Sequence, residues 1–515
     1  MRLCLDLRGV ASVLRRSMWI ALVWGAVAAA PKPVNAEPLL AGVAKVDITN
    51  VDAGPVNDPL YAKALVLKSG DTTAVLVTVD AVAIGEIGPI KNDFLPKVRE
   101  GLKTDLGIPP GSVLVNASHC HGIVCSDVAE RTIAAVKAAH QKLVPVTVGA
   151  GAGHEDRIME NRRLKLKSGK VADVRHAYAL PPDEEVAEVG PVDPQIGILR
   201  LDRADAPGGT LAVLYNFACH PIQGVPSGGN TADLIGFASK VIEENLGPDS
   251  LALFFQGCGG DINPALYKDV ENPRSGEPLG NLLGLSTLRD ARKIECRPDN
   301  RLVVRSETLT LPRRDQTERI AALEAEQRRL LASLQGTSLN FKTFVPLYVK
   351  YGVSGDFPSY SSHRYMQELK LGREDLAKLD ADNRRNMKAY LQNIQTMEEL
   401  TRVQTNLALL RKHQASLVAS GKRTVDVELT GLRVGEWTLT TFPGELTVQI
   451  GLNIKKQFPQ SRTFVAGYTN GYIYYAPTAE QLQNPGSAQE DCDTILAPEW
   501  QAIYEPKAVE ILRGL

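Results

Sequence analysis

The sequence predicts an α/β protein in which layered, mixed β-sheets are flanked by helices and interrupted by a helical insertion. Three changes of pattern support this prediction. Short apolar runs alternate with helix-like stretches in residues 37–310, long amphipathic helical patterns occupy residues 311–423, and β-like runs return in residues 424–515. We therefore expect one catalytic domain formed by the first and third segments, with the second segment inserted into it as a helical subdomain.

Strands are expected where β-branched and apolar residues form a short run that ends on a polar residue or a turn. In the first segment these runs are residues 73–80, 112–116, 144–148, 210–215 and 251–255, with helix-like stretches at 90–101 and 128–141. In the third segment we expect strands at 437–442 and 464–468 and a closing helix at 508–513. Several of these strands end in turns rich in Gly, His, Cys and Asn, and strand ends of α/β folds are common places for functional sites.

The inserted segment is interpreted as a hairpin of long helices. Apolar residues recur at helical spacing up to Gly336 and again from Met387 to Met397, with charged residues on the opposite face. The connecting stretch, residues 341–365, is rich in Phe, Tyr, Gly and Pro, a composition typical of a loop. A structured surface connection is the favoured interpretation, and a lid or substrate wall is the alternative.

The N-terminus has the pattern of an export signal. Basic residues, including Arg15 and Arg16, precede an apolar stretch at residues 18–30, and Val34-Asn35-Ala36 matches the small-residue pattern before a cleavage site. The apolar stretch is short for a bilayer span, so a membrane anchor or a buried helix is the weaker alternative. We expect residues 1–36 to be removed and the protein to be exported.

Charge excludes one broad class of function. The 515 residues carry a formal net charge of -1, so the basic excess of a nucleic-acid-binding protein is missing. The sequence also lacks a Gly-x-Ser-x-Gly motif, which counts against a serine hydrolase.

Histidines and a carboxylate follow three of the predicted strands. His119 and His121 form a His-x-His pair, whose side chains project to the same side of an extended chain. His220 follows a second strand, and a glycine-rich turn after a third strand carries Asp261 and Asn263. A single histidine on a strand is usually a satisfied core residue, but this combination favours a metal or catalytic site.

Three cysteines, Cys120, Cys219 and Cys258, each lie close to one of these residues in the sequence. They fit three roles: thiolate ligands, a disulfide near the site, or small buried side chains, the last being the commonest. Export permits disulfides, but the pairing of the six cysteines that follow residue 36 cannot be read from their spacing.

These turns resemble those of the neutral ceramidase family, the zinc-dependent non-lysosomal ceramidases. The matching segments occur in the family's order along most of the chain after residue 36. They are residues 42–49 (GVAKVDIT), 118–122 (SHCHG), 216–220 (NFACH), 260–264 (GDINP), 443–447 (PGELT) and 467–475 (GYTNGYIYY). The resemblance implies two packed sheets, where the residue pattern alone indicates layered sheets.

The resemblance implies a binding site for one Zn²⁺ ion per chain. It assigns His119, His220 and Glu445 as zinc ligands and Tyr475 as a weaker phenolic ligand. Two neutral imidazoles and one carboxylate would leave the ion with a net positive charge and an open position for water. His121 would stand beside the metal as an acid or an oxyanion partner.

The resemblance also suggests residues around the metal. Arg162 matches an arginine that contacts substrate, and Tyr472 in the tyrosine-rich turn is a second candidate for substrate binding. Asp261 is expected to orient a histidine ligand. Asn263 stands where the family has a serine, and its amide could donate a hydrogen bond to an oxyanion but could not act as a hydroxyl nucleophile.

The function predicted from these features is hydrolysis of an amide bond, with an N-acyl lipid as one candidate substrate, by metal-activated water. The expected partner is a small-molecule or lipid amide, with no nucleic acid, and peripheral contact with a membrane surface is compatible. Two alternatives stay open. One is a metallohydrolase that prefers another bond, such as an ester, and the other is a binding protein that keeps the metal but has lost the reaction.

Overall fold

The computed structural model describes residues 37–175, 180–206, 208–225, 229–265, 267, 274–353, 362–459, 462–484 and 488–515. The predicted signal peptide, residues 1–36, lies outside the described residues. Among the helices in the described ranges, none is both long enough and apolar enough to cross a membrane.

The larger sheet has eight strands in the order β12-β11-β10-β5-β1-β2-β3-β4. The β11–β12 and β3–β4 pairs are parallel and the other pairs are antiparallel, so the sheet is mixed. Its strands are β1 (Leu40–Asp47), β2 (Tyr61–Ser69), β3 (Thr72–Val79), β4 (Val113–Ala117), β5 (Val144–His154), β10 (Gln195–Arg203), β11 (Thr210–Phe217) and β12 (Leu251–Gln256).

The smaller sheet has four strands, β14 (Leu302–Pro312), β15 (Thr424–Val434), β16 (Trp437–Thr441) and β18 (Arg462–Ala466), in that order. Its inner face packs on the larger sheet. Trp437 and Phe464 lie in one apolar cluster with Leu65 and Leu67 of β2, whereas the alternate β2 residues face the opposite side and pack in a different cluster. The period of two along each strand therefore divides its side chains between the layer between the sheets and the layer beneath the helices.

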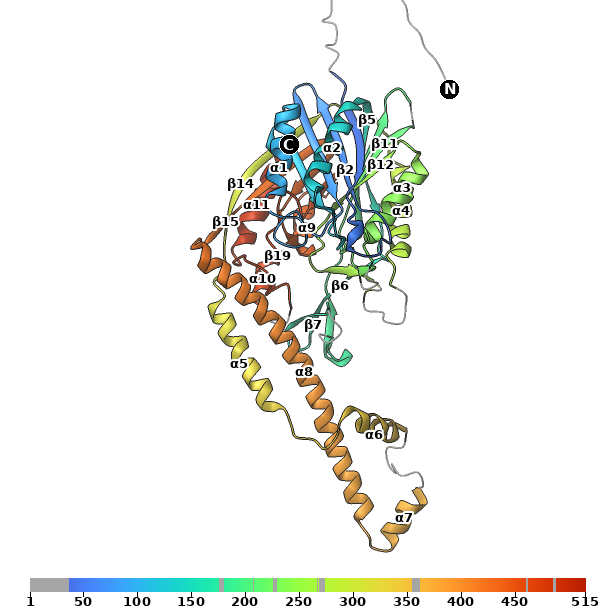
Figure 1. Ribbon diagram of the computed structural model, residues 1–515, viewed down its shortest axis with the longest axis vertical. Helices are drawn as coiled ribbons and strands as arrows, with labels where there is room; N and C mark the ends of the chain where they lie inside the picture. Colours follow the sequence, from blue (N-terminus) through green and yellow to red (C-terminus); the bar gives the residue numbers. More distant parts are fainter. Residues whose placement is uncertain are drawn as a thin grey trace, which may run out of the picture. The chain divides into compact units, whose positions relative to one another are not determined.

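Helices cover the outer faces of both sheets (Figure 1). On the larger sheet, α1 (Phe94–Leu106) and α2 (Val128–Gln141) lie over one half, and α3 (Asp233–Leu246) and α4 (Glu277–Ala291) over the other. On the smaller sheet the covering helices are α9 (Val448–Lys456) and α11 (Trp500–Arg513). The predicted fold class, layered mixed sheets flanked by helices, is confirmed.

Short elements complete the layers near the loops. They are β6 (Met159–Asn161) with β13 (Ile262–Pro264), β17 (Glu445–Leu446) with β19 (Tyr475–Ala476), the sheet of β7 (Arg163–Leu166), β8 (Val171–Asp173) and β9 (Val186–Val189), and the helix α10 (Ala479–Leu482). The β17–β19 pair carries two of the predicted site residues side by side, because Glu445 is paired with Tyr475.

The two ends of the large sheet are brought together by side chains. Lys63, Thr78 and Asn116 form a row across β2, β3 and β4. These side chains form hydrogen bonds with backbone groups at alternate residues of β12. Lys63 donates to the Ala252 carbonyl at 3.1 Å and Thr78 to the Phe254 carbonyl at 2.7 Å, and Asn116 accepts from the Gln256 amide at 2.9 Å. Strand β12 therefore runs along this row, and its C-terminal end reaches the C-terminal end of β4.

Between β14 and β15 the described residues form four helices, α5 (Thr317–Ser333), α6 (Phe341–Val353), α7 (Ser362–Lys370) and α8 (Asp375–Ser420). α5 packs along α8, as Figure 1 shows in yellow and orange. The division into a catalytic domain of residues 37–310 and 424–515 and an inserted subdomain of residues 311–423 stays a proposal.

The expected loop at residues 341–365 is wrong for most of its length, because residues 341–353 form α6 and α7 begins at Ser362. Phe344 and Tyr351 of α6 are buried against Met387 of α8, and this packing supports a helix that the composition did not indicate.

Candidate metal centre and active site

His119 is held at the end of β4 by a backbone in the left-handed region, with φ of 68°. Its amide donates to the Ala81 carbonyl at 3.0 Å, and its ring Nδ1 lies 2.6 Å from the Val82 carbonyl oxygen. Because a carbonyl oxygen can only accept, Nδ1 carries the proton in this hydrogen bond and Nε2 keeps its lone pair. The turn thus fixes both the orientation and the tautomer of the ring.

His220 is held in a similar way after β11. Both its amide and its ring Nδ1 contact the carbonyl of Ile262, each at 3.0 Å. The Nε2 atom is buried and makes no hydrogen bond. A buried ring nitrogen without a hydrogen bond is costly in a folded protein, unless something absent from the protein itself satisfies it.

Glu445 meets both rings. Its Oε2 lies 3.2 Å from Nε2 of His220 and 3.6 Å from Nε2 of His119, and one ligand atom from each of the three residues lies within 4.8 Å of the other two. All three side chains are almost completely buried. Residues that are more than three hundred positions apart in the chain therefore converge on one point.

The spacing of these atoms fits a zinc ion. Ligand atoms about 2.0–2.1 Å from a tetrahedral zinc lie roughly 3.3 Å from one another, close to the two distances measured to Glu445. The Nδ1 contacts to backbone carbonyls are the interactions that commonly orient a ligating histidine. The buried, unbonded Nε2 of His220 is the third indication. The donor set therefore suits a divalent metal ion such as Zn²⁺, and His119, His220 and Glu445 are the residues that could hold it.

Electrostatics keep the imidazoles neutral and the carboxylate charged. Burial lowers the pKa of His119 to about 4 and also lowers the pKa of His220. Burial alone would raise the pKa of Glu445, but His119, His220 and a hydrogen bond from Tyr472 together hold that pKa below its ordinary value. Neutral imidazole and ionised carboxylate are the forms that bind a metal, so the site needs little change of protonation to take one.

Two tyrosine hydroxyls donate to the ends of Glu445. Tyr472 donates to Oε1, and Tyr468, whose ring lies 4.3 Å from that of His119 between centroids, donates to Oε2 at 3.2 Å. Burial raises the pKa of both phenols well above the usual value, so they remain donors. They fix the position of the carboxylate between the rings.

The three candidate ligands open onto a cavity of about 330 Å³. His121 lines it, with its ring centroid 5.6 Å from that of His119, and burial lowers the pKa of His121 to about 4. The other predicted residues that line this cavity are Arg162, Tyr472 and Tyr475. None of the described part of residues 341–365 lines it, which argues against the lid or substrate wall.

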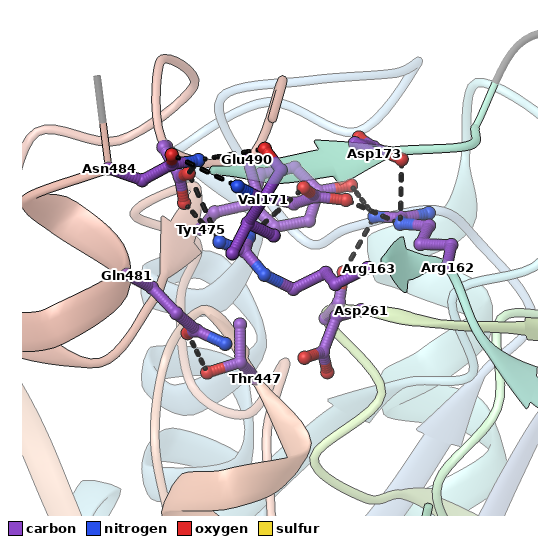
Figure 2. A network of polar contacts seen from close by, with 12 residues as sticks. Arg162, Arg163, Val171, Asp173, Asp261, Thr447, Tyr475, Gln481, Asn484 and Glu490 are labelled. Atoms are coloured by element: carbon purple, nitrogen blue, oxygen red, sulfur yellow. Dashed lines mark hydrogen bonds and ion pairs between the residues drawn. The ribbon is translucent and has the colours of Figure 1, made fainter. Parts of the chain in front are cut away.

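Arg162 is only 1% exposed and its donors are largely used inside the protein. Nε donates to Glu490 at 2.5 Å, Nη1 to Asn263 at 3.1 Å, and Nη2 to the Gly260 carbonyl at 2.6 Å and to the Tyr475 hydroxyl at 3.2 Å. Figure 2 shows Arg162, Tyr475 and Glu490 within one polar network. Arg162 thereby fixes the wall that carries Tyr475.

Asp261 and Asn263 do not reach the cavity. Asp261 accepts from the Val448 amide at 2.8 Å and from the Asn161 side-chain amide at 3.4 Å, and neither partner is a histidine. The residue that orients His220 is instead Ile262, through its backbone carbonyl. The oxygen of Asn263 accepts from Arg162, while its amide nitrogen is buried without a hydrogen bond, and the expected roles of Asp261 at a histidine and of Asn263 at an oxyanion stay predictions.

The sequence analysis missed several residues that line the cavity or hold its lining residues in place. Tyr468 on Glu445 is one, and Arg175, whose guanidinium lies 4.9 Å from the Tyr475 ring centroid, is another. Glu490 is a third, since its carboxylate bonds Arg162 and Arg163. The tyrosine-rich turn signalled Tyr468, but the two charged residues stand in segments with no distinctive pattern.

The six cysteines at positions 120, 125, 219, 258, 296 and 492 are all free thiols. Cys120, Cys219 and Cys258 are buried, burial raises the pKa of each, and none belongs to the group that could hold a metal. Of the three roles considered for them, small buried side chains fit the structure.

No protein-family model and no curated protein sequence matches this chain. Its fold does match solved structures. One is the neutral ceramidase from Pseudomonas aeruginosa, at 17% identity and a TM-score of 0.56, covering 93% of this chain and 75% of that one. Another, described as ceramidase complexed with C2, has 18% identity and a TM-score of 0.57, covering 92% and 75%. The chain therefore has a ceramidase-like fold.

Proposed function

We propose that this protein is an exported zinc-dependent hydrolase that cleaves an amide bond, with an N-acyl lipid amide as the leading substrate class. The observation that carries the proposal is the convergence of His119, His220 and Glu445 at zinc-ligand spacing, with both Nδ1 atoms anchored on carbonyls. The ceramidase-like fold supports an amide as the bond that is cleaved.

In this proposal His119, His220 and Glu445 hold the ion and Tyr475 is a weaker phenolic ligand. Zinc bound there would supply a Lewis acid for the substrate carbonyl and lower the pKa of a coordinated water towards about 7. Tyr468 and Tyr472 keep Glu445 in place, and Arg162 keeps Tyr475 in place. The protein thus supplies a fixed frame that does not have to reorganise during the reaction.

His121 is the proposed proton carrier. It lines the cavity beside His119, and its low pKa means that the ring is neutral at pH 7. A neutral ring can accept a proton on one nitrogen and release it to the leaving amine, as general acid–base catalysis requires. Arg162 and Tyr472 are proposed to contact the substrate where they border the cavity.

The experiment measures zinc by elemental analysis together with hydrolysis of a short N-acyl amide, for wild type, His119→Ala and Glu445→Gln. We expect one zinc per chain in wild type and a loss of both zinc and hydrolysis in the two variants. His154→Ala is the matched control, because His154 is exposed and should leave both readouts unchanged.

Full zinc binding and activity in His119→Ala would contradict the proposed site. Faster turnover of the corresponding ester would assign a different bond preference. Normal zinc content with no hydrolysis across a panel of amides and esters would favour the non-catalytic alternative.

Export is tested separately on the full-length chain. We expect a secreted or periplasmic product whose first residue is Glu37. Retention of residues 1–36 on a membrane-bound product would instead identify this segment as an anchor.

A further inference from the structure

Helix α6 is apolar on two sides. One side, formed by Phe344, Leu347 and Tyr351, packs on α8, where the rings of Phe344 and Tyr390 stack at 4.6 Å between centroids. The spacing of three and four residues places these side chains on one helical face. This inner face accounts for the attachment of α6 to the rest of the protein.

The second apolar side of α6 is exposed. We call it the outer stripe, and it consists of Phe341, Val345, Tyr348, Val349 and Val353. Phe341 is 69% exposed and Val353 is 84% exposed. The spacing again follows the helical repeat, so these side chains share one face that no described residue covers. Soluble proteins seldom leave such a contiguous apolar face in water without a partner.

The surroundings of the outer stripe are basic. Within residues 341–353 and 362–373, five residues are basic (Lys342, Lys350, Arg364, Lys370 and Arg373) and one is acidic (Glu368), while residues 374–388, which begin α8, carry four basic and four acidic residues. The chain as a whole has a net charge of -1, so positive charge is concentrated here. Three more apolar side chains, Met366, Leu369 and Leu371, are half exposed in and just after α7.

We propose that the outer stripe of α6 binds the surface of an anionic lipid bilayer. Aromatic and branched apolar side chains beside lysines are the composition of helices that lie in a membrane interface. Thirteen residues of helix are too few to span a bilayer, so α6 would lie along its surface. The basic residues complement anionic headgroups and add electrostatic attraction near the surface.

Charge also separates this partner from a second copy of the chain. Two outer stripes placed face to face would bring together Lys342 and Lys350 of two α6 helices, and residues 341–353 include no acidic residue to offset them. Like charges at such a contact are repulsive. The inference does not rest on the proposed hydrolase function, because none of the residues involved lines the catalytic cavity.

The test is co-sedimentation of the protein with two kinds of vesicle, one of phosphatidylcholine alone and one that also contains about 30% phosphatidylserine. We expect binding to the anionic vesicles that weakens as salt is raised. Val345→Ser with Val349→Ser should reduce the partition coefficient at least about tenfold, and so should Lys342→Glu with Lys350→Glu.

Matched controls lie at the other end of the insertion. Val418 is 71% exposed near the end of α8, and Lys422 is exposed just beyond it, so Val418→Ser and Lys422→Glu should bind vesicles like wild type. Far-UV circular dichroism and thermal unfolding check that each variant is folded. Because neither readout involves hydrolysis, failure of this inference and failure of the proposed function are distinguishable.

Three outcomes would overturn the inference. The first is no binding of wild type to anionic vesicles, and the second is unchanged binding by the folded Val345→Ser, Val349→Ser variant. The third is a wild-type dimer in analytical ultracentrifugation that the same double variant converts to a monomer, which would assign the outer stripe to self-association.

Discussion

At the scale of single residues, the position of Glu445 depends on two buried hydroxyls. Tyr472→Phe removes the donor on Oε1 and leaves that oxygen buried without its partner. We expect zinc affinity to fall about 10- to 100-fold, the usual effect of losing a group that orients a metal ligand. Competition with a chromophoric chelator at pH 7 measures the change.

The control for this prediction is Tyr348→Phe, which removes a hydroxyl from a tyrosine that is 54% exposed on α6. Its zinc affinity should equal that of wild type. Equal affinity in Tyr472→Phe would mean that the carboxylate is fixed without this hydrogen bond.

The residues proposed as zinc ligands could be named from short motifs, because His, Glu and Tyr in those turns have recognisable neighbours. The groups that orient them could not. The carbonyls of Val82 and Ile262 carry no side-chain signal, and each comes from a segment distant in sequence from the ring it holds. The sequence predicts Asp261 beside a histidine, whereas in the structure its carboxylate accepts from the Val448 amide.

At the scale of elements, the glycine-rich turn after β12 fits closely against β17. A Cβ atom on Gly260 would lie 2.6 Å from the Glu445 carbonyl oxygen and 2.8 Å from that of Leu446. Both contacts are backbone, so relief requires β17 to move. We expect Gly260→Ala to lower the free energy of unfolding by about 1–3 kcal/mol and to weaken zinc binding, because Glu445 would shift.

Urea unfolding and zinc titration check this prediction, with Gly336→Ala as the control. Gly336 lies in the connection between α5 and α6, and an added Cβ there would meet nothing within 4 Å. A Gly260→Ala variant as stable as the control and with wild-type zinc affinity would show that the turn accommodates a Cβ atom without displacing β17.

Elements with a strong repeat were the ones that sequence could predict. The strands and the helix α2 follow their patterns, whereas α6 was hidden by its Phe, Tyr, Gly and Pro content. The closing helix was predicted to begin at residue 508, but α11 starts at Trp500 and continues through Pro506. Tertiary packing of Trp500 and Tyr504 on Phe442 supports the extra turns.

At the scale of the whole molecule, the two sheets approach closely where Gly197 of β10 faces Phe464 of β18. A Cβ on Gly197 would lie 2.4 Å from the Phe464 ring. Gly197→Ala should therefore destabilise the protein by about 1–3 kcal/mol. Because the ring is the obstacle, Gly197→Ala combined with Phe464→Leu should cost less than the sum of the two single changes, by about 0.5–3 kcal/mol.

Denaturant unfolding of the four proteins in this cycle supplies the coupling free energy. Strictly additive changes in the free energy of unfolding would show that Gly197 and Phe464 are not energetically coupled.

The way the sheet closes on itself could not be predicted. Local patterns give the strands, but the row of Lys63, Thr78 and Asn116 meets β12 from segments more than a hundred residues away. The hydrophobic periodicity of the sequence does not indicate these contacts between distant strands. The same contacts bring the His119 turn and the glycine-rich turn close together.

The continuous helix α8 has a consequence for how substrate could arrive. Tyr390 of α8 contacts α6. Farther along the same helix, Nε2 of His413 lies 2.8 Å from Oδ1 of Asp493, and Asp493 lines the catalytic cavity. The 23 positions between them (413 minus 390) correspond to about 35 Å of helix. A bilayer bound at α6 would therefore contact the protein one long stretch of helix away from the catalytic cavity, and a lipid amide would have to cover that distance to reach the proposed metal.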